Sequence, residues 1–203
     1  MIISHLLLGF ATSYIGYTPP SMLNLTASRI RIENDKKAAY QFMYGASLVV
    51  LVQVFLAVSL PSLLKMNPEI ISTIEKIAVF LFAILSFLFV YKGVSSQKKK
   101  IQKPIKNPFA FGISLSFVNL FSIPFFALTH SVFVMHGWAE TGISCISIFG
   151  IGSMLGTFAI LYSYVFLAQR FENTLKVYSK YANLSIGIIL GLVAFYSASN
   201  IYL

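Results

Sequence analysis

Two adjacent prolines interrupt the first long apolar run of the chain. Pro19 and Pro20 lie within "IGYTPPSMLN", in a run that contains no Lys, Arg, Asp or Glu. Proline lacks the backbone N–H and clashes with the carbonyl four residues earlier, and it disfavours helical backbone at the residue before it. We therefore expect a helix break that frees the carbonyls of Ile15 and Gly16 and exposes backbone N–H groups near Ser21.

A break of this kind offers the chemistry of a small-molecule site. The N–H groups at the start of a half-helix attract an anionic group, and freed carbonyls attract a cationic one. A zwitterionic amino acid carries both. A second apolar run contains Pro124, which frees the Leu120 carbonyl beside Asn119 and Ser122. Since irregular backbone at membrane depth is tolerated where it lines a cavity, we expect the two breaks to meet near the midplane.

The sequence therefore predicts a substrate site at these two breaks. Asn24, Gln53 and Asn119 are the strongest side-chain candidates, because each carboxamide can both donate and accept hydrogen bonds. The predicted substrate-binding set is Ile15, Gly16, Thr18, Pro19, Pro20, Ser21, Asn24, Gln53, Asn119, Ser122 and Pro124. The alternative for each residue is a role in helix packing, with the proline kinks healed by neighbouring side chains.

The elements that must position these residues are membrane helices. Of the 203 residues, 57% are hydrophobic and only 10% are charged. A water-soluble protein of this size could not bury so many apolar residues in its core. The stretches between charge clusters are long enough to cross a bilayer. We predict six transmembrane helices, at about 3–28, 39–64, 70–92, 108–130, 141–168 and 181–202. The first run has no basic segment before it, so we expect a retained helix and not a signal peptide.

Positive charge is confined to alternate loops. All but two of the 15 Lys and Arg follow the first, third and fifth predicted helices. This positive-inside pattern predicts a multi-pass protein of the plasma membrane with cytoplasmic basic loops and both termini outside. The net charge of +9 is thus a topology signal, and no nucleic-acid partner is expected.

The basic connector 93–106 separates two three-helix halves, 1–92 and 107–203. An odd number of helices in each half places the halves in opposite orientations, which permits the inverted repeat of many secondary transporters. We therefore expect an all-α integral membrane protein of six helices in two inverted three-helix repeats, with helices 1 and 4 broken by proline.

Weak internal similarity supports this repeat. Residues 13–25 ("SYIGYTPPSMLNL") align with 116–128 ("SFVNLFSIPFFAL"), and the segment that begins at Gly45 aligns with the one at Gly152. Gly152 and Gly156 also form a small-xxx-small pair, which favours close approach of another helix.

No Lys, Arg, Asp or Glu lies well inside a predicted span. A cationic substrate would need a buried carboxylate, and a divalent metal would need several hard oxygen or imidazole ligands. His5, His130 and His136 lie near the outer helix ends, where we expect solvated histidines. The alternatives are a proton-sensing cluster and a weak metal site. We therefore predict no metal, no cofactor and no catalytic residues.

The two broken segments resemble those of the LysE-type superfamily of amino-acid exporters, the lysine/homoserine exporters. "TPPSMLNLTASR" stands where that family carries Pro-Gly-Pro in its first helix, and "NLFSIPFFA" stands where it carries Asn-Pro-Lys followed by paired Phe. "GASLVVL", with Val50, stands where the family often has an acidic residue. The resemblance implies a divergent member located in a bacterial inner membrane.

We predict a secondary transporter, not an enzyme, that exports a small polar metabolite by alternating access, with a neutral amino acid or derivative as the best-matched substrate. Alternatives are a divalent metal or ion exporter of the same superfamily and a non-transporting membrane scaffold. The expected partners are a small-molecule substrate and the lipid bilayer, and a homodimer is compatible with a chain of this size.

Overall fold

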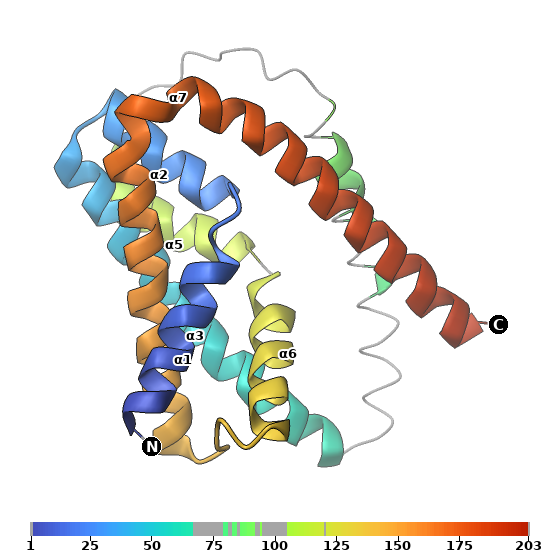
Figure 1. Ribbon diagram of the computed structural model, residues 1–203. Coiled ribbons are helices and arrows are strands. Elements are labelled where there is room, and N and C mark those ends of the chain that lie inside the picture. Colours follow the sequence, from blue (N-terminus) through green and yellow to red (C-terminus); the bar gives the residue numbers. More distant parts are fainter. Residues whose placement is uncertain are drawn as a thin grey trace. The chain divides into compact units, whose positions relative to one another are not determined.

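The computed structural model describes residues 2–66, 79–80, 83–84, 86–91, 94, 105–119 and 121–202. The chain separates into two compact units, one made of Met1–Ser62 with Lys103–Phe171 and the other of Leu63–Gln102 with Glu172–Leu203. The described residues form helices and the turns between them, with no strand. The helices are α1 (Ile2–Gly16), α2 (Met22–Glu33), α3 (Lys36–Met66), α5 (Pro108–Val118), α6 (Ser122–Met135) and α7 (Ile143–Tyr202) (Figure 1).

Several of these helices have the length and the apolar composition of membrane-spanning helices. In the described part of the chain, α3 over Lys36–Ser59 and α7 over Ile143–Ala168 are each long and apolar enough to cross a membrane. Helices α5 and α6 pass the same test as one span that bends by 65° at its break. Helix α1 is apolar but shorter. These helices are those of a membrane-embedded protein.

Two predicted boundaries were wrong. The first predicted span was to end near residue 28, but α2 continues to Glu33, where an Arg29–Glu33 ion pair of 2.7 Å supports its last turns. A loop was predicted at 169–180, but the structure has a helix there, as part of α7. That segment is basic but contains no Pro or Gly, so nothing in it stops a helix. Most of the predicted span 70–92 and of the connector 93–106 lies outside the described residues.

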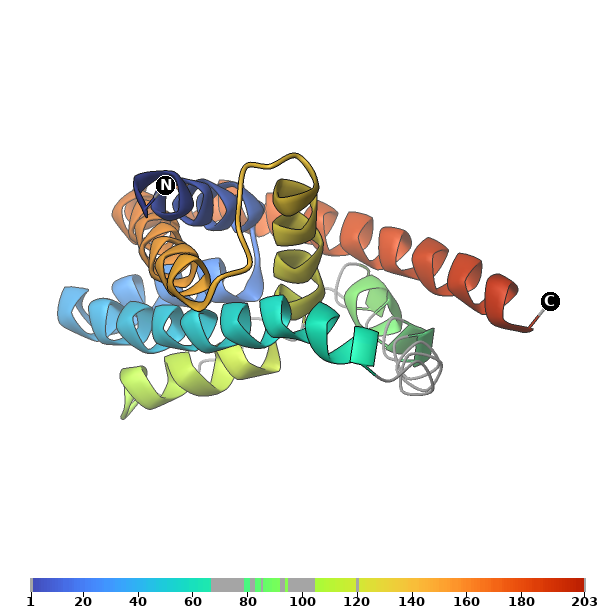
Figure 2. The same ribbon diagram turned by 90° about the horizontal axis from the view of Figure 1, so that it is seen from below.

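Within the first unit, glycines bring two helix pairs into close contact (Figures 1 and 2). Gly9 of α1 lies against the Phe149 backbone of α7, and Gly112 of α5 lies against the Phe42 backbone of α3. The predicted packing glycine Gly152 faces the backbone of Leu6 on α1. A side chain at any of these glycines would collide with main-chain atoms, so the backbones approach closely only because the Cβ atom is missing.

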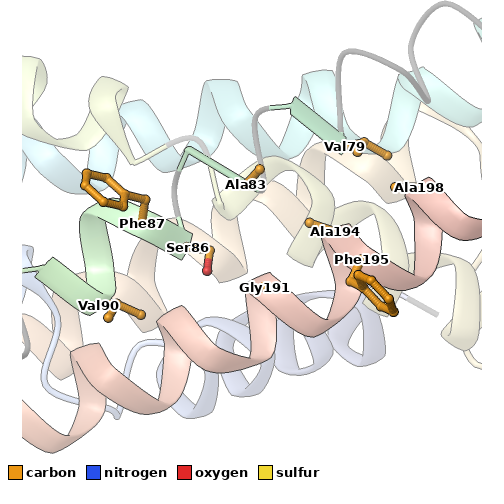
Figure 3. A pocket seen from close by; sticks show the side chains of 9 residues that line it. All are labelled: Val79, Ala83, Ser86, Phe87, Val90, Gly191, Ala194, Phe195 and Ala198. Atoms are coloured by element: carbon orange, nitrogen blue, oxygen red, sulfur yellow. The ribbon is translucent and has the colours of Figure 1, made fainter.

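The second unit contains a shallow apolar pocket. Short helical stretches around Ser86 lie beside the C-terminal part of α7, where the Ser86 hydroxyl donates a hydrogen bond of 2.7 Å to the Gly187 carbonyl. Figure 3 shows the pocket of 520 Å³ between them. Its lining is almost wholly aliphatic and aromatic, as expected where helices pack in lipid.

Candidate functional site at two helix breaks

The first break lies between α1 and α2. The last helical bond of α1 joins Tyr17 N to Ser13 O at 2.9 Å, and Thr18 N then donates to Ile15 O at 3.1 Å. The Ile15 carbonyl, which we expected to be free, is therefore paired through a tight turn. The double proline interrupts the helix as predicted, over residues 17–21.

Two side chains satisfy the carbonyls of this break. Asn24, which is fully buried, donates from Nδ2 to the Tyr17 carbonyl at 2.6 Å and to the Pro19 carbonyl at 3.0 Å. The Tyr164 hydroxyl of α7 donates to the Thr18 carbonyl at 2.6 Å. These bonds answer the requirement that backbone groups at membrane depth be paired.

The new half-helix begins with a serine cap. Ser21 adopts extended backbone (φ −100°, ψ 170°), and its hydroxyl accepts a hydrogen bond from Asn24 N at 3.3 Å. Serine is among the preferred residues at this position because its oxygen pairs with an otherwise free N–H. Asn24 thus donates hydrogen bonds to residues of the break from both its backbone N–H and its side chain.

The second break lies between α5 and α6. Asn119 N donates to Ser116 O at 3.0 Å, and Ser122 N donates to Asn119 O at 3.2 Å. Gln53, from α3, donates from Nε2 to the same two carbonyls, Ser116 O at 2.9 Å and Asn119 O at 3.3 Å. The Leu120 carbonyl, predicted to be free, lies outside the described residues.

Side chains join the two breaks directly. The Tyr17 and Ser122 hydroxyl oxygens lie 2.6 Å apart, and Asn119 Nδ2 donates to the Ser122 hydroxyl at 3.0 Å. The Phe125 ring also covers Gly16, so closely that an added Cβ would lie 2.7 Å from its Cε1 atom. We call the five linked residues Gln53, Asn119, Ser122, Tyr17 and Asn24 the polar network.

Each end of the polar network carries an unused acceptor. Asn24 Oδ1 and Gln53 Oε1 are buried and have no hydrogen-bond partner among the described residues. Most buried polar atoms in proteins are paired, because an unpaired one costs about 1–3 kcal/mol. Two unpaired carboxamide oxygens next to two helix breaks are suited to receive N–H or O–H donors from a bound molecule.

The structure brings together only part of the predicted set. Four of its members enter the polar network: Asn24, Gln53, Asn119 and Ser122. The side chains of Ile15, Thr18 and Pro19 are exposed, and Gly16 serves as a packing surface. Pro20, Ser21 and Pro124 are half-buried beside the breaks.

Sequence reasoning missed the two tyrosines that tie the first break to other helices. Tyr17 is buried, with 6% of its surface exposed, and Tyr164 reaches the break from α7. One signal was present, since a tyrosine hydroxyl inside a double-proline segment of an apolar run needs a hydrogen-bond partner. The identity of that partner could not be predicted from the neighbouring sequence, because Ser122 lies 105 positions away.

The outer histidines were expected to be solvated, and two of them are not. His5 and His130 expose only 2% and 3% of their surfaces. His5 Nε2 accepts a hydrogen bond from Glu140 N at 2.9 Å, and the His130 ring meets Phe149 edge-on at 5.2 Å. Their helices carry them into contact with the loop before α7 and with α7 itself. Among the described residues no three His, Cys, Asp or Glu side chains gather as metal ligands would.

Comparison with known proteins identifies the family. No curated protein and no solved structure matches the chain. The model of one family, described as LysE type translocator, matches residues 14–200. That match covers both helix breaks and every helix that borders them except most of α1. The chain therefore belongs to the LysE type translocator family, whose members are membrane proteins that transport small molecules.

Proposed function

We propose that this protein is a secondary transporter that exports a small neutral polar metabolite, such as a neutral amino acid or a derivative, by alternating access around the two helix breaks. The observation that carries the proposal is the polar network, in which the Tyr17–Ser122 contact of 2.6 Å joins one break to the other. A scaffold protein has little use for two interrupted helices held together by buried polar groups.

An inverted repeat is supported by the glycine contacts. Gly9 meets Phe149 and Ser153, and Gly112 meets Phe42 and Ala46. The same shift that aligns 13–25 with 116–128 takes Gly9 to Gly112. The shift that aligns Gly45 with Gly152 takes Phe42 to Phe149 and Ala46 to Ser153. Equivalent glycines thus make equivalent contacts in the two halves, as two repeats related by a pseudo-two-fold axis would.

The reciprocal contacts agree with the same alignment. Gly45 lies against the Phe109 backbone, and Gly152 lies against the Leu6 backbone. The shift that takes Gly9 to Gly112 also takes Leu6 to Phe109. Repeats of this kind can rock against each other around a central site. Helix contacts at glycines favour such motion, because no side chain at these positions blocks it.

The chemistry of the breaks favours a neutral or zwitterionic substrate. Among the described residues, the buried ionisable side chains are those of His5, His130 and Tyr17, and no buried carboxylate is present. Asn24 Oδ1 and Gln53 Oε1 are neutral acceptors. They suit a neutral hydroxyl group, or an ammonium group whose charge is balanced by an anionic group of the same substrate, because an isolated cation would lack a counter-ion.

In the conformation described here, side chains meet at the junction of the two breaks, where the Tyr17 and Ser122 hydroxyl oxygens lie 2.6 Å apart. Access for a substrate therefore requires the Tyr17–Ser122 hydrogen bond to open. We propose that substrate hydrogen bonds to the two free carboxamide oxygens replace this bond during transport.

The basic loops support an orientation in which they face the cytoplasm, with both termini outside and the protein in a bacterial inner membrane. The proton gradient or the membrane potential would supply the driving force. We propose export on the basis of family membership, and a homodimer is compatible with this arrangement.

The test starts with ligand-induced thermal stabilisation of the purified protein against a panel of amino acids and divalent metals. A molecule that binds only the folded state raises its unfolding temperature. The stabilising molecule is then followed in proteoliposomes by counterflow. We expect a neutral amino acid to stabilise the protein, and Asn119→Ala to lose both stabilisation and flux while it still folds.

The outcomes separate the candidate functions. Stabilisation by metals alone would overturn the amino-acid proposal in favour of an ion exporter. Counterflow that persists unchanged in Pro19→Ala/Pro20→Ala protein would place the substrate away from the breaks. Absence of both binding and flux across the whole panel would favour a scaffold.

A further inference from the structure

A small pocket opens where α2 ends, α3 begins and α7 passes. It measures 240 Å³ and belongs to the first unit. Its lining consists of Arg31, Lys36, Tyr40, Tyr162, Val165 and Phe166. We call it the basic pocket. It has no residue in common with the polar network and plays no part in the proposed transport site.

The two cations of the basic pocket are not neutralised locally. The nearest acids in sequence have other partners: Glu33 pairs with Arg29 at 2.7 Å, and Asp35 accepts a hydrogen bond from Ala38 N at 2.6 Å. Within the described residues, neither pocket cation forms an ion pair. Two like charges held together in this way favour an anion as their common partner.

Aromatic rings form the wall of the basic pocket. The Tyr40 and Tyr162 rings stack at 6.1 Å, and Lys36 Nζ lies 5.5 Å from the Tyr40 ring centre. Within the described residues, the two tyrosine hydroxyls have no hydrogen-bond partner. They can therefore donate to the same anion as the cations.

The pocket is also continuous with an apolar surface. Tyr162 stacks on Phe166 at 6.3 Å, and Phe166 leaves 73% of its surface exposed. An exposed ring on a membrane-spanning helix faces lipid chains or a partner molecule. A ligand that combines an anionic head with an acyl chain would use the cations, the hydroxyls and this ring together.

We propose that the basic pocket binds the phosphate group of an anionic phospholipid, with Arg31 and Lys36 on the phosphate and Phe166 against the acyl chain. A soluble phosphate has the same anionic chemistry but makes no use of the apolar wall. The site lies in the first basic loop, where helices α2 and α3 meet, and a lipid bound there would hold that corner together.

The test compares two sources of phosphate on the full-length protein in detergent. One arm measures unfolding temperature in mixed micelles with phosphatidylglycerol against phosphatidylcholine. The other adds inorganic phosphate against sodium chloride of equal ionic strength. The variants are Arg31→Gln and Lys36→Gln, singly and together. Lys37→Gln is the matched control, because it removes the same charge from an exposed neighbour that does not line the pocket.

We expect phosphatidylglycerol to stabilise the protein more than phosphatidylcholine does. The concentration for half the effect should rise about tenfold or more in the double variant, the factor expected for a lost hydrogen bond to a charged group. Lys37→Gln should leave it unchanged. Arg31→Lys should give an intermediate loss, since it keeps the charge but not the planar fork.

Other outcomes are equally clear. If inorganic phosphate stabilises as well as the lipid, and the double variant loses the effect, the phosphate site stands but its ligand is soluble. If Lys37→Gln weakens the lipid effect as much as the pocket variants do, the attraction is a general surface charge effect and the proposal is wrong. It is also wrong if neither source of phosphate exceeds its control. Unfolding temperatures in phosphatidylcholine show whether each variant folds.

Discussion

The hydroxyl oxygens of Tyr17 and Ser122 lie 2.6 Å apart, at two helix breaks in different halves of the chain. Around this contact, Asn24 holds the carbonyls of one break and Gln53 holds those of the other. Hydrogen bonds therefore hold each break and join it to the other, and a rearrangement at one break would have to change the contact that joins them.

The first prediction concerns this hydroxyl pair. Tyr17→Phe and Ser122→Ala should each lower the stability of the folded protein, and the double variant should lose less than the sum. The interaction energy should be about 0.6 kcal/mol, the average for hydrogen bonds between membrane helices. A double-mutant cycle of unfolding in detergent measures it.

Tyr14→Phe is the control for that cycle. The Tyr14 hydroxyl lies 3.5 Å from that of Ser163, at the limit of a hydrogen bond, so its removal should change stability little. Strictly additive losses for Tyr17→Phe and Ser122→Ala would show that the two hydroxyls do not interact in the membrane.

The second prediction concerns Gln53. Gln53→Met keeps the volume of the side chain but leaves the Ser116 and Asn119 carbonyls without this donor. The buried amide serves both carbonyls at 2.9 and 3.3 Å, and each carbonyl keeps a backbone N–H donor in the variant. The variant should therefore lose about 0.5–1.5 kcal/mol of stability, the net contribution of an ordinary hydrogen bond. Unfolding in detergent measures the loss.

Gln41→Met is the matched control for Gln53. Gln41 lies on the same helix and is exposed, so the same chemical change there removes no buried bond. If the two variants lose equal stability, Gln53 does not hold the second break.

The breaks themselves were predictable because proline acts locally. A helix that continues through the double proline at 19–20 cannot form all of its backbone hydrogen bonds. The structure interrupts the helix there. Pro124 lies in the first turn of α6, where proline is well tolerated. The sequence pattern therefore located both interruptions and four of the five residues of the polar network.

The partners of the breaks could not be predicted in the same way. Tyr164 and Tyr17 bond to groups 146 and 105 positions away in the sequence, and no local pattern encodes such a pairing. The burial of His5 and His130 has the same origin, since it depends on which helices pack at the outer end. The helix through 169–180 was missed because a cluster of basic residues was interpreted as a loop.

The third prediction tests the repeat. Gly9→Ala and Gly112→Ala should both impair folding, because each added methyl group meets a carbonyl of the facing helix. Overpacking of this kind costs about 1–3 kcal/mol. The yield of monodisperse protein and its unfolding temperature measure the effect.

Gly142→Ala is the control for the glycines, because no atom lies within 4 Å of the position of its added Cβ. The repeat predicts comparable losses at Gly9 and Gly112. A severe loss at one of them with a neutral effect at the other would contradict equivalent packing in the two halves.

The fourth prediction concerns Tyr164, which holds the first break from α7. Its hydroxyl donates to the Thr18 carbonyl at 2.6 Å, and its own carbonyl accepts from the Ser28 hydroxyl at 3.1 Å. Tyr164→Phe removes only the first of these bonds. The amide of Thr18 should then exchange with deuterium about fivefold faster, as expected when an opening step loses about 1 kcal/mol of protection.

Tyr44→Phe controls for the loss of a tyrosine hydroxyl. Tyr44 is 59% exposed, and its ring packs at a tilt against Phe158 with ring centroids 4.9 Å apart. The ring should therefore stay in place in the variant, and exchange at Thr18 should not change. Equal exchange in wild-type and Tyr164→Phe protein would mean that Asn24 alone holds the break. If Tyr164→Phe speeds exchange and also alters counterflow, opening of this break limits transport, because one hydrogen bond then governs both motions.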